Sequence, residues 1–150
     1  MKTIKFLSMM LLASSLFFGC KKDKTEAKDP RDQVAGLYHF ADKTLIHASM
    51  VSSLNDTTVE DAGTLIISKE GTDKLIFLEN NLAGHQFTFY ANSVSGLTSI
   101  TFTIPTQMVE SGGATFPISG SGTFNSGIIS FEYKGTIENI PFDCKTDGYK

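Results

Sequence analysis

Apolar and polar side chains alternate along several short stretches of this chain. In 99–104 every second residue is Ile or Phe, and the residues between them are Ser or Thr; 86–91 and 129–134 follow the same pattern. A period of two residues places successive side chains on opposite faces of a β-strand, whereas a helix needs a period of 3.6. Each stretch therefore predicts a strand of an antiparallel sheet with one apolar and one solvated face.

Turn sequences separate these stretches at the spacing of a β-meander. Two further runs, 64–68 and 75–78, are apolar on both faces and predict covered strands. The segments 69–73 and 80–84 combine Gly, Asn and Asp, and Asn125-Ser126-Gly127 is typical of a tight hairpin. Consecutive strands are therefore expected to pair with each other.

The start of the domain and its middle are less regular. We expect the first strand at 36–40 and the second at 44–51. Pro105 is expected to end a strand, because it has no N–H for a sheet ladder. The stretch 107–115 is then a long connection or a loop at the end of the sheet, and Gly120 and Gly122 would let a strand bend.

About eight strands and no long helix are expected. So many strands in so few residues must close or stack to protect their edges. Because the turns are short and consecutive, we predict an all-β domain: a single antiparallel up-and-down barrel. The alternative is a β-sandwich, which needs a long crossing connection, and 107–115 is the longest candidate.

The N-terminus has the features of an export signal. Lys2 and Lys5 precede an apolar run at 6–18, which is shorter than the roughly 20 residues of a membrane-spanning helix. The run ends on Gly19 and Cys20, and 16–20 resembles the lipobox of bacterial lipoproteins. We therefore predict a signal peptide at 1–19 and lipidation of Cys20. The alternative is an ordinary signal peptide that is cut nearby.

A charged segment separates this cysteine from the domain. Residues 20–33 contain no large apolar side chain after Cys20, so they are expected to form a disordered tether, with the domain at 34–150. By resemblance to enteric lipoproteins, the lysine at position 21, in place of aspartate, implies anchoring in the outer membrane. Whether the domain faces the periplasm or the cell surface stays open.

The second cysteine of the chain is Cys144. If Cys20 carries lipid, Cys144 has no intramolecular partner. It lies in the last expected strand and is interpreted as a small buried side chain. The alternative is an intermolecular disulfide or a redox-reactive thiol.

Composition excludes some functions. Asp and Glu outnumber Lys and Arg in the domain, which argues against nucleic-acid binding. The histidines His39, His47 and His85 lie on separate stretches, and a metal site needs three or four convergent ligands. The chain has no Gly-x-Ser-x-Gly motif. We therefore expect no metal, no cofactor and no enzymatic activity.

Aromatic side chains dominate the expected inner face of the barrel. An eight-stranded barrel is barely wide enough for its own side chains or one small ligand. We interpret these residues as core filling; the alternative is that they line an apolar ligand cavity. The candidates for that cavity are Phe77, Phe87, Phe89, Phe102, Phe131 and Tyr133.

Several short motifs resemble a known group of proteins. They are Val-x-Gly-x-Tyr at 34–38, Gly-Thr-Leu-x-Ile at 63–67, Ile-Pro-x-Gln at 104–107 and Gly-Ser-Gly-x-Phe at 120–124. The chain resembles small Bacteroidetes-type lipoproteins with a lipocalin-like (calycin-like) barrel. The resemblance implies a lipid-anchored envelope protein with a lipocalin-like barrel, a group whose function is largely uncharacterised. From the anchor, the strand meander and the aromatic inner face, we expect the barrel to bind a small apolar or amphipathic ligand at the outer membrane. The alternative is a structural or accessory lipoprotein with a filled core, which binds an envelope protein and no ligand.

Overall fold

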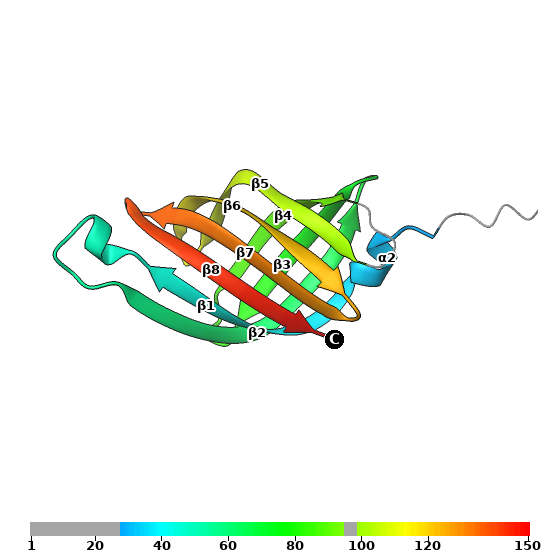
Figure 1. Cartoon of the computed structure of the whole chain (residues 1–150), viewed down its shortest axis with the longest axis horizontal. Helices are drawn as coiled ribbons and strands as arrows, with labels where there is room; N and C mark the ends of the chain where they lie inside the picture. The colour runs from blue at the N-terminus through cyan, green and yellow to red at the C-terminus, as the bar shows by residue number, and fades with distance from the viewer. Residues whose placement is uncertain (1–27, 95–98) are drawn as a thin grey trace, which may run out of the picture.

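The computed structural model describes residues 28–94 and 99–150, which form a closed barrel of antiparallel strands in sequence order (Figure 1). Each strand pairs with the next along the chain, and the last pairs with the first. This confirms the predicted all-β, eight-stranded up-and-down barrel and excludes the sandwich. The strands are β1 (Gly36–Ile46), β2 (Thr57–Glu70), β3 (Lys74–Asn81), β4 (Gln86–Val94), β5 (Ile100–Ser111), β6 (Ala114–Asn125), β7 (Ile128–Ile137) and β8 (Ile140–Tyr149).

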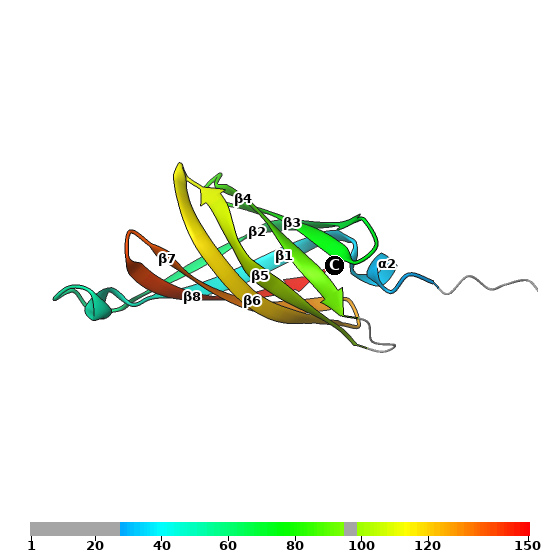
Figure 2. The same ribbon diagram turned by 90° about the horizontal axis from the view of Figure 1, so that it is seen from above.

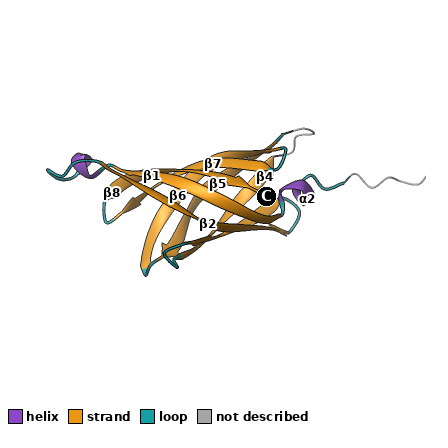
Figure 3. Ribbon diagram, turned by 90° about the horizontal axis from the view of Figure 1, so that it is seen from below, coloured by secondary structure: helices purple, strands orange, loops and turns teal. Residues whose placement is uncertain are grey.

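Two short helices lie at opposite ends of the barrel (Figure 3). The helix α2 (Arg31–Val34) precedes β1, and the 3₁₀ turn η2 (Ala48–Met50) lies in the β1–β2 connection. No helix in 28–94 or 99–150 is long and apolar enough to cross a bilayer.

The first strand corrects the expected boundaries. β1 runs without interruption through 40–44, where two strands, 36–40 and 44–51, were predicted. The apolar alternation fails at Asp42, because this inward position holds a carboxylate that lines a cavity. Residues 48–50 form η2 and do not extend a strand.

The predicted loop at 107–115 is also wrong. β5 continues past Pro105, and a bulge between Ile104 and Gln107 accommodates the proline that cannot donate to the ladder. Gly112 and Gly113 have positive φ angles of 59° and 81° and form the turn to β6. This region is therefore a long hairpin at the end of the barrel opposite α2.

The hairpin at Asn125-Ser126-Gly127 confirms its prediction. Asn125 pairs with Ile128, so Ser126 and Gly127 form the two-residue turn between β6 and β7. Both have positive φ angles, 51° and 85°, as a type I′ turn requires.

The segment before the barrel belongs to the fold. Arg31 is only 6% exposed, and its guanidinium donates hydrogen bonds to three backbone carbonyls of the β2–β3 turn and pairs with Asp29 at 2.8 Å. Residues 29–33 were expected in the disordered tether, but they cover this end of the barrel. The charged sequence of 29–33 did not indicate that the segment packs on the barrel, because the partners of Arg31 are backbone carbonyls far along the chain.

A small cluster of residues from α2, β1 and the C-terminus closes the same end of the barrel. Val34 and Tyr38 are fully buried, and the Tyr38 hydroxyl donates to the carbonyl of Val34 at 2.5 Å. The Lys150 ammonium lies 5.2 Å from the centre of the Tyr38 ring and 5.7 Å from that of Phe124. These contacts tie both ends of the folded domain to one another.

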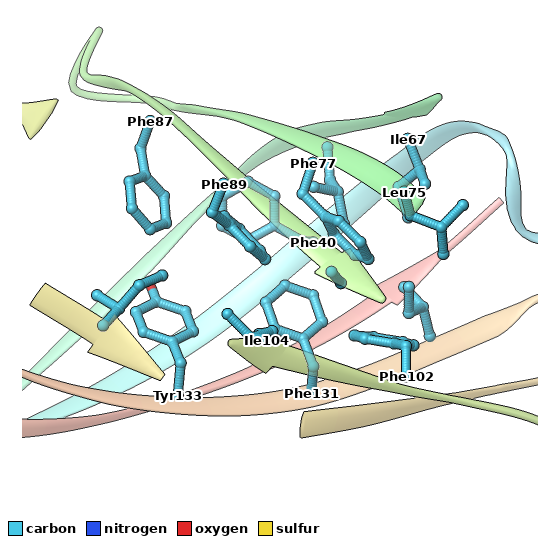
Figure 4. Packing of buried hydrophobic residues seen from close by; sticks show 14 of the residues in the cluster. Phe40, Ile67, Leu75, Phe77, Phe87, Phe89, Phe102, Ile104, Phe131 and Tyr133 are labelled. Carbon is cyan, nitrogen blue, oxygen red and sulfur yellow. The ribbon is translucent and has the colours of Figure 1, made fainter. Parts of the chain in front are cut away.

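Phenylalanines fill the middle of the barrel (Figure 4). Phe77, Phe89, Phe102 and Phe131 are at most 3% exposed. The Phe77 ring centre lies 4.8 Å from that of Phe89, 5.1 Å from that of Phe102 and 5.6 Å from that of Phe131. This packing is typical of a solid core.

Two inward glycines of β6 allow close packing against neighbouring residues. A Cβ on Gly122 would lie 2.4 Å from both Phe102 and Phe131, and one on Gly120 would lie 2.1 Å from the carbonyl oxygen of Glu132. β6 curves strongly along this stretch (Figure 2), in agreement with the predicted bend.

Candidate functional site

A cavity opens at the end of the barrel opposite α2. It has a volume of about 400 Å³, within the range of ~300–1,000 Å³ that is usual for small-molecule sites. Its rim is formed by the C-terminal end of β1 and by the β3–β4 and β7–β8 turns. The lining residues are Phe40, Asp42, Thr44, Ile46, Val59, Asp61, Glu79, Asn81, His85, Phe87, Ser111, Phe116, Tyr133, Ile137, Glu138, Ile140 and Phe142.

Aromatic rings form much of the cavity wall. The ring centre of Phe87 lies 5.7 Å from that of Tyr133, and the ring centre of Phe142 lies 5.8 Å from that of Phe116 and 6.3 Å from that of Tyr133. All four rings are at least nine-tenths buried, and so is Phe40. The wall therefore offers an apolar surface to the body of a ligand.

Two carboxylates face each other across neighbouring strands. Asp42 on β1 is directly opposite Asp61 on β2, and both line the cavity. The Asp61 amide donates to Asp42 at 3.1 Å, and the Asn81 side chain donates to Asp61. Burial and the charge of Asp61 raise the pKa of Asp42. Like charges directly opposite each other destabilise a sheet, so this pair is not explained by folding.

A third carboxyl, Glu79 on β3, lies deeper. It is 5% exposed, and its Oε1 finds no hydrogen-bond partner among the described residues. Burial, together with the charges of Asp42 and Asp61, raises its pKa to about 8. At neutral pH, without a partner, this carboxyl is therefore mostly protonated.

Basic side chains are rare around this cavity. Its lining contains no lysine or arginine, and His85 at the rim is its one histidine. In the described part of the chain, no three His, Cys, Asp or Glu side chains converge as metal ligands. The three carboxyls thus form an acidic surface without the geometry of a metal centre.

Comparisons of the chain with protein-family models, with curated proteins and with solved structures give no match. The closed barrel is compatible with a lipocalin-like fold. A barrel fold of this kind does not by itself define a function, and the cavity is the feature that bears on it.

The predicted cavity residues divide into two groups. Phe87 and Tyr133 line the cavity. Phe77, Phe89, Phe102 and Phe131 pack beneath it, as Figure 4 shows for the successive layers of rings. Cys20, the predicted lipidation site, lies outside the described residues.

The sequence analysis did not identify the three carboxyls, Asp42, Asp61 and Glu79, as cavity residues. A signal for two of them was present, because Asp42 continues the inward series of Tyr38 and Phe40, and Glu79 continues that of Leu75 and Phe77. A period-two pattern extended through polar residues would have placed both inside the barrel.

Cys144 lies on β8 beside this cavity and is 2% exposed. Its Sγ is 3.9 Å from an Asp42 carboxylate oxygen and 3.8 Å from the Thr146 hydroxyl. Burial raises the pKa of the thiol to about 11, so it is protonated at neutral pH. This agrees with its interpretation as a buried side chain.

The histidines do not gather at one site, but His47 has acidic partners. Its Nε2 is 2.7 Å from the Asp143 carboxylate, and its Nδ1 is 3.6 Å from that of Asp56. The hydrogen bond with Asp143, together with the charges of both aspartates, raises the pKa of His47. The Ser49 hydroxyl donates to Asp56 at 2.5 Å, so it is not activated by the histidine. The cluster fastens the β1–β2 connection to β8.

Proposed function

We propose that this protein is a non-enzymatic lipoprotein of the outer membrane that binds a small amphipathic ligand in the barrel. The observation that carries the proposal is the cavity of about 400 Å³, open at one end, with aromatic walls and carboxyls at its side and floor. Because the core beneath it is filled, the cavity is closed at its inner end. A ligand with one apolar part and one polar part matches such a surface.

The sequence supports the membrane anchor. The apolar run at 6–18 ends on Gly19 and Cys20, which is the arrangement expected for lipidation. Cys20→Ser should abolish lipid labelling and membrane association. If both persist in this variant, the anchor is wrong, whereas the binding function would still stand.

Two observations favour binding over covalent chemistry. The thiol of Cys144 is held protonated by burial, and the hydroxyl of Ser49 donates to the Asp56 carboxylate and not to His47. Neither group is activated as a nucleophile.

The binding function is tested with a neutral probe. Phenylbutanol would be titrated calorimetrically into the protein purified in nonionic detergent from cells expressing the full chain, with a micelle blank. Val59 lines the cavity mouth and is 47% exposed, so Val59→Trp should obstruct entry and weaken binding.

The matched control is Leu37→Trp, which adds the same ring on the outer face of β1, where Leu37 is 56% exposed. We expect this variant to bind phenylbutanol as the wild type does. If the wild type takes up no more probe than the micelles, or if Val59→Trp binds as well as Leu37→Trp, the cavity is not a ligand site.

An alternative is an accessory lipoprotein that acts through an exposed loop. The β1–β2 connection extends beyond the barrel (Figure 1) and presents Met50 and Leu54, which are 71% and 65% exposed. Isolation from membranes of a specific envelope protein that is lost in a Met50→Ser, Leu54→Ser variant would support this alternative. Recovery of the same proteins with the variant would remove it.

A further inference from the structure

Acidic side chains predominate among the ionisable residues of the cavity lining. Three neighbouring strands, β1, β2 and β3, each contribute one carboxyl to its lining: Asp42, Asp61 and Glu79. The lining contains no lysine or arginine that could neutralise them. An anionic ligand would add a like charge to a partly desolvated site, where such repulsion is stronger than in water.

Glu79 gives the second, independent indication. It is 95% buried, it lines the cavity, and its Oε1 has no partner in the part of the chain that the structure describes. A buried polar atom that is left unpaired costs free energy that a partner would recover. A hydrogen-bond donor on a ligand would satisfy Oε1, and beside two further carboxyls a positively charged donor is the one that gains most.

The apolar part of the site fits the same chemistry. Phe87 pairs directly with Glu79 across β3 and β4, and the Tyr133 ring lies 5.7 Å from the Phe87 ring. Aromatic faces attract organic cations and also cover apolar groups. The carboxyls are spread over three strands and do not converge on one metal-sized point.

We propose that the ligand is an organic amine, whose ammonium group lies among Asp42, Asp61 and Glu79 and whose apolar body packs against Phe87 and Tyr133. This inference rests on the proposed binding function and specifies the ligand class. The ammonium donates to Oε1 of Glu79, and its charge takes the place of the proton that burial otherwise keeps on this carboxyl. Asn81 holds Asp61 in place through its side-chain hydrogen bond.

Three probes with the same body separate the head-group chemistries: phenylbutylamine, phenylbutanol and phenylbutanoic acid. Each would be titrated at neutral pH into the same detergent-purified protein. We expect the amine to bind about tenfold or more tightly than the alcohol, which is the effect of one charge-assisted hydrogen bond. The acid should bind more weakly than the alcohol.

Glu79→Gln keeps the shape of the side chain and removes its charge. We expect it to weaken amine binding about tenfold or more and to leave alcohol binding unchanged. Asp61→Asn is a second variant at a less buried position and should act in the same direction. Glu60→Gln is the matched control: this carboxylate, adjacent to Asp61 in sequence, is exposed on the outer face and pairs with Lys43 at 3.5 Å. Glu60→Gln should bind both the amine and the alcohol as the wild type does.

The outcomes distinguish the two proposals. If the alcohol or the acid binds as tightly as the amine, or if both cavity variants bind the amine like the wild type, the amine inference is overturned while the binding function stands. If no probe binds beyond the micelle blank, or if Val59→Trp fails to weaken the probes that bind, the binding function itself fails.

Discussion

Glu79→Gln should stabilise the protein, by an amount that grows with pH. Glu79 is buried without a hydrogen-bond partner for Oε1 among the described residues, and it lies near Asp42 and Asp61 in an aromatic setting. Its ionised form is therefore unfavourable in the folded protein. Glutamine has nearly the same shape but carries no charge at any pH.

The size of the effect follows from the pKa of Glu79, which is raised from 4.5 to about 8 by burial and by the two aspartates. Between these values the folded protein holds a proton on Glu79 that the unfolded chain has released. The free energy of unfolding therefore falls as pH rises from about 4.5 to about 8, by up to about 5 kcal/mol in total. This loss is absent in Glu79→Gln. Tyr133 and Cys144, which also face this carboxyl, have raised pKa values and stay neutral in this range.

Urea denaturation of wild type and Glu79→Gln, at pH values from about 4 to about 9, measures the difference directly. We expect the two proteins to differ little at the acidic end and the variant to be more stable by several kcal/mol at the alkaline end. The same series on Glu60→Gln, which loses an exposed carboxylate, should follow the wild type. A difference between wild type and Glu79→Gln that does not change with pH would refute the argument, because it would show that Glu79 titrates as in the unfolded chain.

Three further predictions concern the core, the sheet and the loop. Phe77→Ala should lower the free energy of unfolding by about 3–5 kcal/mol in chemical denaturation, since it empties the centre of the ring cluster. Gly120→Ala should lower it by about 1–3 kcal/mol in the same assay, because its Cβ would meet the backbone of Glu132; an unchanged midpoint would contradict the close approach of β6 and β7. In an NMR titration His47 should show a pKa above 6.5 that Asp143→Asn lowers, and equal values in both proteins would exclude the ion pair.

The strands that could be predicted are those whose inward residues are apolar. Stretches such as 100–104 and 129–134 have this property, and both lie within strands. β1 was divided in two because its inward face changes from Phe40 to Asp42, and a period-two pattern of apolar residues stops there. The extent of β5 was missed for another reason: a bulge lets the strand pass Pro105, and bulges depend on the partner strand.

The cavity was only partly visible in the sequence. Aromatic residues at inward positions were identified, but alternation does not say at which height in the barrel each ring lies. That depends on the register between strands, which places Phe77 opposite Phe89 and Glu79 opposite Phe87. The pairing of Asp42 with Asp61 is likewise a property of register, because the two residues are remote in the chain.

The seal that Arg31 makes at one end of the barrel bears on where a ligand comes from. Eight residues lie between Cys20 and Asp29, so a lipid on Cys20 would hold the domain by a tether of at most about 30 Å. Such a tether would join the closed end and leave the cavity mouth at the far end of the barrel. If the protein is anchored in this way and binds a ligand in the cavity, the ligand would enter from the aqueous compartment and not from the lipid to which the protein is attached.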